Sequence, residues 1–128
     1  MNEPKWILVE TVISIHQIIL AEHGGSTGIR DMSLLESALA RPKQRYVYQP
    51  ESTLFELAAS YSFDLAKNHP FVDGNKRTSL TVGILFLELN GLSFHAPEPE
   101  AVIAFENLAS GLISELGLSD WFRLHSVS

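Results

Sequence analysis

The stretch from residue 80 to residue 89 is apolar on nearly every side when it is drawn as a helix. This pattern is typical of a helix buried in the centre of a domain, because a surface helix keeps one polar face. Residues 90–91 are an Asn-Gly pair, which ends such a helix in a left-handed conformation. Asp73 is a good N-cap residue and Gly74 lets the backbone turn in, so we expect the helix to begin near Gly74 or Asn75. The rest of the chain is expected to pack around this central helix.

Two cations, Lys76 and Arg77, fall in the first turn of this helix. The positive end of the helix dipole makes a cation there unfavourable by roughly 0.3 to 1 kcal/mol. Unpaired N–H groups at a helix N-terminus bind phosphate, and a glycine allows close approach of the backbone. Lys76 and Arg77 would complete such an anion site, with arginine able to grip two oxygens at once. The alternative is an ordinary exposed turn with two solvated charges.

The residues before the helix add chemistry to this anion site. His69 precedes Pro70, so it is expected to leave helical geometry and to end the preceding helix. A histidine side chain titrates near neutral pH and suits the removal of a proton from a hydroxyl. Asp73 would offer carboxylate oxygens to a hard cation such as Mg²⁺ at the edge of the phosphate site. Taken singly, His69 could simply pack and Asp73 could simply cap; together they predict a catalytic site.

Residues 69–78 resemble the signature of the Fic/Doc superfamily, His-x-Phe-x-[Asp/Glu]-[Gly/Ala]-Asn-[Gly/Lys]-Arg, and match it at every specified position. The signature with lysine after the asparagine resembles that of the Doc branch, the death-on-curing toxins of type II toxin-antitoxin modules. The adenylylating Fic branch has glycine there and a second arginine where this chain has Leu80. The resemblance extends from the first predicted helix to residues 90–91, and includes the wording Gly-Ile-Arg-Asp at residues 28–31.

The resemblance implies an all-α, compact single-domain Fic/Doc fold and a role for each residue of the signature. His69 would be the general base, Phe71 would pack under the loop and Asp73 would bind magnesium. The nucleotide phosphates would be held by Gly74, Asn75, Lys76 and Arg77.

The activity implied by the resemblance is transfer of the gamma-phosphoryl group of Mg²⁺-bound ATP to a Ser or Thr hydroxyl of a protein. Elongation factor Tu is the implied target, so that translation would be blocked. The implied partner is a Phd-like antitoxin whose disordered C-terminal segment folds over the site. Two alternatives stay open: AMP transfer with the same histidine base, and a non-catalytic corepressor that bridges antitoxin molecules.

About six helices are expected in one domain over residues 1–128. Five more segments are predicted to be helical besides the central one: residues 10–23, 32–40, 53–68, 100–112 and 120–125. Asp31 is expected to cap the second helix, Ser119 the last, and Thr53 with Glu56 to form a capping box. Residues 24–28 are read as a plain connector. Residues 41–50 are read as a solvated loop, or as the flap that aligns the target in this superfamily.

Composition limits the function further. The chain has 128 residues, which suits one domain with a real core, and no cysteine, which excludes disulfides and thiolate metal sites. A net charge of -6 opposes general affinity for nucleic acid. Neither a signal peptide nor an apolar stretch long enough to span a membrane is visible. A cytoplasmic protein with no direct nucleic-acid or membrane partner is therefore expected.

Overall fold

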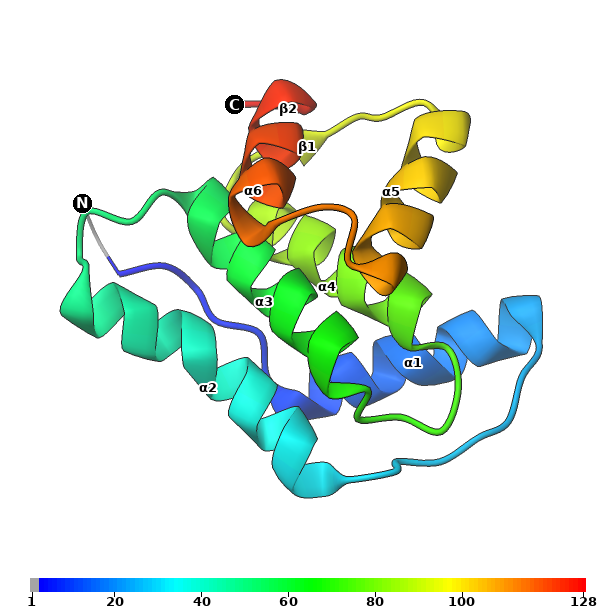
Figure 1. Ribbon diagram of the computed structural model, residues 1–128. Coiled ribbons are helices and arrows are strands. Elements are labelled where there is room, and N and C mark those ends of the chain that lie inside the picture. The colour runs from blue at the N-terminus through cyan, green and yellow to red at the C-terminus, as the bar shows by residue number, and fades with distance from the viewer. Residues whose placement is uncertain (1–2) are drawn as a thin grey trace.

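The computed structural model describes residues 3–128 and consists mainly of six helices. Two strands of two residues each pair near the C-terminus (Figure 1). The elements in chain order are α1 (Val9–His23), α2 (Met32–Tyr48), α3 (Leu54–Asn68), α4 (Asn75–Leu89), β1 (Ser93–Phe94), α5 (Glu98–Ser110), α6 (Glu115–Leu124) and β2 (Ser126–Val127). The expected all-α architecture is confirmed.

Helices α3 and α4 form the middle layer of the molecule (Figure 1). Helix α3 packs against α2 on one side and α6 on the other, while α4 packs against α1 and α5. The side chains at the centre of these contacts are at most 1% exposed: Leu57, Ala58, Tyr61 and Leu65 from α3, and Leu80, Val82, Phe86 and Leu87 from α4. The predicted central helix is thus confirmed, and α3 shares the centre with it.

Several helix ends lie where the sequence places them. The Asp31 carboxylate accepts a hydrogen bond from the backbone N–H of Leu34 at 3.2 Å. Thr53 and Glu56 form the expected capping box, with bonds of 2.8 and 3.1 Å. Gly91, with φ of +93°, follows the end of α4 in the left-handed region. Local side-chain chemistry therefore sets these boundaries.

Helix α2 continues to Tyr48, so the prediction of a loop or flap at residues 41–50 is wrong. Pro42 lies inside the helix and is buried. The extension is held by tertiary contacts of Arg45, which donates to Glu56 of α3 at 3.1 Å and to Glu115 of α6 at 2.7 Å. These charged bonds join three helices and favour the helical conformation past the proline.

The C-terminal part also differs from the prediction in detail. Helix α5 begins at Glu98 and ends before Gly111, which is left-handed with φ of +77°. Helix α6 begins at Glu115, because Ser114 is its N-cap and accepts from the N–H of Gly117 at 2.9 Å. Ser119, the expected cap, is buried within the helix. The short strands β1 and β2 were not predicted; they pair Ser93 with Val127 and Phe94 with Ser126.

One carboxylate, Asp64 of α3, is buried, with 6% of its surface exposed. Arg41 Nε lies 3.7 Å from one carboxylate oxygen, and the Ser60 hydroxyl donates to the same oxygen at 3.4 Å. Burial raises the pKa of Asp64, and the charge of Arg41 only partly opposes this. The ionised form of this side chain is therefore less favourable in the folded protein than in the unfolded chain.

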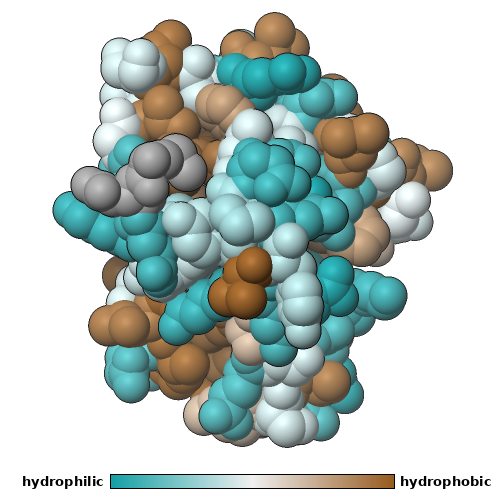
Figure 2. Space-filling model, turned by 90° about the vertical axis from the view of Figure 1, so that its left-hand side faces the viewer, coloured by the Kyte–Doolittle hydropathy of each residue, from teal (hydrophilic) through white to brown (hydrophobic). Residues whose placement is uncertain are grey.

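The face shown in Figure 2 is the left-hand side of Figure 1. Hydrophilic residues cover most of its middle, and apolar residues are spread among them and toward its edges. Within residues 3–128, every helix is too short or too polar to cross a membrane.

Gly83 lies where α4 crosses α3 and meets α6. A Cβ at this position would clash with the Ser62 hydroxyl and would lie 2.8 Å from Phe122 and 3.0 Å from the Ala58 carbonyl oxygen. We predict that Gly83→Ala lowers the free energy of unfolding by about 1 to 3 kcal/mol, because overpacking outweighs the gain in helix propensity. Chemical denaturation measures this. Gly117→Ala, also within a helix but facing flexible side chains, is the control; an equal loss there would contradict the packing argument.

Asp64→Asn tests the cost of the buried carboxylate. A pKa raised by folding means that the folded protein binds this proton more tightly than the unfolded chain. The penalty is therefore present near pH 7 and disappears as the pH falls below the usual range for aspartate. We expect Asp64→Asn to be more stable than wild type at pH 7, with the difference shrinking toward pH 4, by thermal unfolding at both values. A destabilised variant at pH 7 would show that the Arg41 contact dominates.

Candidate active site

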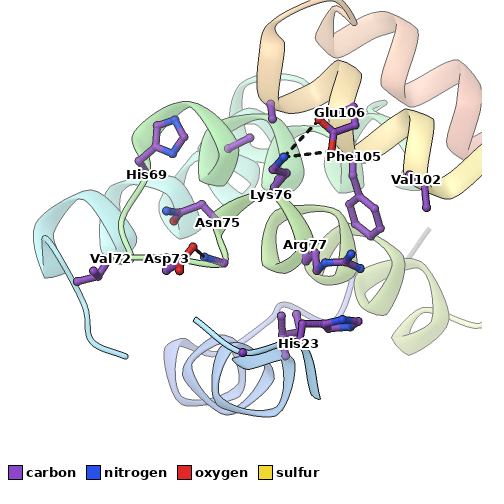
Figure 3. A pocket seen from close by; sticks show the side chains of 15 residues that line it. His23, His69, Val72, Asp73, Asn75, Lys76, Arg77, Val102, Phe105 and Glu106 are labelled. Carbon is purple, nitrogen blue, oxygen red and sulfur yellow. Dashed lines mark hydrogen bonds and ion pairs between the residues drawn. The ribbon is translucent and has the colours of Figure 1, made fainter. Parts of the chain in front are cut away.

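A cavity of about 460 Å³ opens where the turn between α3 and α4 faces α5 and the end of α1. Figure 3 shows the side chains around it. All six residues predicted for the site line this cavity: His69, Asp73, Gly74, Asn75, Lys76 and Arg77. The structure thus brings these six residues together at one cavity.

The turn between the two central helices is closed by Asn75. Its side-chain oxygen accepts from the backbone N–H of Phe71 at 3.0 Å, and its side-chain N–H donates to the Phe71 carbonyl at 2.8 Å. The Phe71 ring is buried, with 1% of its surface exposed. An asparagine can both donate and accept in this way, whereas aspartate cannot. Asn75 is therefore first a residue that shapes the loop, although it also faces the cavity.

His69 follows the last residue of α3 and ends it, as expected from Pro70. Its backbone has φ of +47° and ψ of +58°, the left-handed region, rather than the extended conformation that usually precedes proline. The residue is exposed and lines the cavity. Its side chain is thus accessible to a molecule that enters the cavity.

Asp73 does not cap α4, contrary to the prediction. The N-cap is Gly74, in the left-handed region with φ of +78°. The Asp73 carboxylate instead accepts from the N–H of Gly74 at 2.8 Å through Oδ1 and from the N–H of Ser26 at 3.2 Å through Oδ2. Each carboxylate oxygen has a further lone pair, and the side chain is exposed at the cavity. The donor chemistry therefore fits a hard divalent cation.

No three histidine, cysteine or acidic side chains within residues 3–128 gather closely enough to hold a metal ion by themselves. Magnesium is commonly held by one or two carboxylates, with phosphate oxygens and water completing its shell. Asp73, beside the first turn of α4, would supply one carboxylate in that mode of binding.

The first turn of α4 offers positive groups to the cavity. Gly74 has no side chain to cap the helix, and among residues 3–128 no partner is seen for the backbone N–H groups of Asn75, Lys76 and Arg77. The Lys76 ammonium contacts both carboxylate oxygens of Glu106 at 3.1 and 3.3 Å. The Arg77 guanidinium lies over the Phe105 ring, 5.5 Å from its centre. Helix α5 thus orients both cations, as Figure 3 shows.

The ion pair between Lys76 and Glu106 is exposed, with 49% and 62% of the two side chains accessible. Exposed pairs contribute about 0 to 1 kcal/mol. An anion in the cavity can therefore compete for Lys76 at little cost.

His16 of α1 contributes to the site and was given no role from the sequence. It is buried, with 3% of its surface exposed, and its ring stacks on Phe71 with centres 3.8 Å apart and planes 9° from parallel. Its Nε2 lies 2.8 Å from the Asp73 carbonyl oxygen. Because a carbonyl can only accept, Nε2 carries the proton in this contact. His16 therefore supports the loop from below. The only sequence signal for it is its place on the apolar face of α1, between Val12 and Ile19.

An extended segment, residues 24–31, runs beside the turn between α3 and α4. Ile29 and Phe71 form an antiparallel bridge, and Val72 donates to the Gly28 carbonyl at 3.1 Å. Gly25 has φ of +125°, and a Cβ there would lie 2.8 Å from the Asp73 carboxylate, so this position requires glycine. The connector predicted at residues 24–28 is thus packed against the site.

Asn75→Ala tests whether the paired hydrogen bonds hold the turn. Both Phe71 backbone groups would lose their partner, so we expect the free energy of unfolding to fall by about 1 to 3 kcal/mol. The Phe71 amide should exchange with solvent faster, as measured by NMR. Asn107→Ala is the control, since its side chain makes no hydrogen bond within residues 3–128. Unchanged exchange at Phe71 would contradict this role of Asn75.

Comparison of the sequence with known proteins finds Fic/Doc relatives. The model of the Fic/DOC family matches residues 6–87. "Protein kinase doc" of Escherichia phage P1 is 33% identical over 119 residues, covering 93% of this chain and 94% of that protein. "Toxin Doc" of Mycolicibacterium smegmatis is 43% identical over 75 residues, 57% of each chain. The signature, the helical fold and these matches together show that the chain belongs to the Fic/Doc family, in its Doc branch.

Proposed function

We propose that this protein is a Doc-type toxin that transfers the gamma-phosphoryl group of ATP to a Ser or Thr hydroxyl of a protein. The observation that carries the proposal is one cavity lined by His69, Asp73 and the N-terminus of α4 with its two cations. Similarity to a protein named as a kinase and to another named as a toxin supports both halves of the proposal.

His69 acts as the general base in this proposal. Its imidazole takes the proton from the acceptor hydroxyl as the oxygen attacks the gamma-phosphorus and the bond to the ADP leaving group breaks. A positioned base of this kind contributes about 10²- to 10⁴-fold to a rate. The accessible position of His69 at the cavity suits an acceptor that belongs to another protein.

The nucleotide phosphates are held by the first turn of α4. The backbone N–H groups of Asn75, Lys76 and Arg77 and the two side-chain cations face the charge that develops on the phosphoryl oxygens. Asp73 would hold Mg²⁺, and the ion would neutralise phosphate charge. Leu80, in place of the second arginine of the Fic branch, is buried and offers no contact to a further phosphate.

The acceptor protein is expected to lie along residues 24–31. This segment is extended, runs beside the catalytic turn and is mostly exposed. A strand of the acceptor placed along it would bring a hydroxyl toward His69, and alignment of this kind accelerates transfer. In this proposal residues 24–31 have the flap role that the sequence suggested for residues 41–50. Residues 41–48 cannot have that role, because they belong to helix α2.

Elongation factor Tu is the proposed acceptor. Its phosphorylation would block translation in the cytoplasm. A Phd-like antitoxin is the proposed partner, with its C-terminal segment over the cavity. The target and the antitoxin rest on the resemblance to Doc proteins, not on a feature of the cavity.

The test is a labelling assay in bacterial extract with Mg²⁺ and ATP labelled at the gamma or the alpha phosphate. We expect a protein band labelled only from gamma-labelled ATP, with the rate falling at least 100-fold in His69→Ala. The labelled band identifies the acceptor. His95→Ala is the matched control, because His95 is exposed and does not line the cavity.

Label from the alpha phosphate would instead establish AMP transfer. Absence of any His69-dependent label, in the extract and with purified elongation factor Tu, would contradict the enzymatic proposal and favour a non-catalytic antitoxin-binding role.

A further inference from the structure

His69 is held in a conformation that its own sequence does not favour. Within residues 3–128 it is the one residue other than glycine with positive φ. Left-handed backbone is unfavourable for a residue with a side chain, because its Cβ then lies too close to the following carbonyl oxygen. Such a conformation persists only where the surroundings fix it. The contacts around His69 should therefore reveal what holds it.

Arg30 makes the relevant contacts. Its Nε donates to the His69 carbonyl oxygen at 2.7 Å, and its Nη2 donates to the Asn68 carbonyl oxygen at 2.8 Å. These two carbonyls belong to the peptide groups on either side of the His69 Cα. Fixing both peptide planes fixes φ and ψ of His69, and hence the direction in which its side chain leaves the backbone.

The chemistry of arginine suits this task. The guanidinium is a rigid, planar fork whose N–H groups reach two acceptors at once, whereas lysine offers one flexible point charge. The carbonyls at the C-terminus of α3 also carry partial negative charge, which favours a cation there. Arg30 does not line the cavity. It is thus placed to act on the base without touching a bound molecule.

We propose that Arg30 is a positioning residue for His69, clamping its two flanking peptide groups so that the imidazole faces the acceptor hydroxyl. The inference rests on the proposed role of His69 as general base. Displacement of a reacting group by about 1 Å can cost roughly 100-fold in rate. Loss of the clamp should therefore lower kcat while leaving nucleotide binding intact.

A purely structural role for Arg30 would be to fasten residues 24–31 to the turn. The backbone already does this without the side chain: the N–H groups of Arg30 and Asp31 donate to the Pro70 carbonyl at 2.7 and 3.0 Å, and Val72 donates to Gly28. Removing only the guanidinium should consequently leave the segment in place and free His69 alone.

The experiment compares Arg30→Met and Arg30→Lys with Arg123→Met. Arg123 is the matched control: it is exposed on α6, donates to Asp120 at 2.8 Å and does not line the cavity. We expect Arg30→Met to lower kcat by about 10- to 100-fold with the KM for ATP within twofold. Arg30→Lys should restore part of the loss, and Arg123→Met should match wild type.

A second readout does not depend on activity. The chain has five histidines, whose imidazole signals can be followed by NMR. In Arg30→Met we expect the His69 signal to shift or broaden while those of His16, His23, His95 and His125 stay unchanged.

Several results would overturn the inference: kcat within twofold of wild type, a rise in KM with kcat unchanged, an unmoved His69 signal, or displacement of all five signals together. If wild type itself transfers no phosphoryl group, the proposed function fails, but the NMR comparison still decides whether Arg30 holds His69.

Discussion

The paired hydrogen bonds between the Asn75 side chain and the Phe71 backbone are the contact on which the site depends. They join the start of α4 to the middle of the turn that connects it to α3. The Phe71 ring is buried in the core, and the His16 ring stacks on it. Because the core is close-packed, this arrangement gives the turn that carries His69 and Asp73 a well-ordered support, on which Arg30 then fixes the backbone of His69.

Two cations at the N-terminus of α4 are unfavourable locally, and contacts from α5 compensate for this. Lys76 and Arg77 lie at the end of α4 that repels cations, where the N–H groups of residues 75–77 have no partner among the described residues 3–128. Helix α5, about 30 residues later, supplies a carboxylate for Lys76 and an aromatic face for Arg77. Both contacts are weak enough to yield to a bound anion. Two cations therefore lie at the cavity beside the carboxylates of Asp73 and Glu106, in a protein whose net charge is -6.

Local chemistry explains which boundaries were predictable. The capping box of Thr53 with Glu56 and the cap of Asp31 depend on residues three apart, and both lie where expected. Helix α2 continues through Pro42 because Arg45 reaches Glu56 and Glu115, one on α3 and one on α6, and no local pattern contains that information. The start of α6 was misplaced at Ser119, whereas Ser114, five residues earlier, is the cap and accepts from the N–H of Gly117. The choice between them depends on which one the core covers.

The sequence by itself determined the central buried helix, the end of α3 at His69 and six of the residues that line the cavity, because the motif places these six within nine consecutive positions. The tertiary structure alone decided the rest. His16 on α1, Arg30 before α2, and Phe105 and Glu106 on α5 reach the same turn from distant parts of the chain. Only packing of the helices brings such residues into contact, since their separation along the sequence carries no periodic or capping signal.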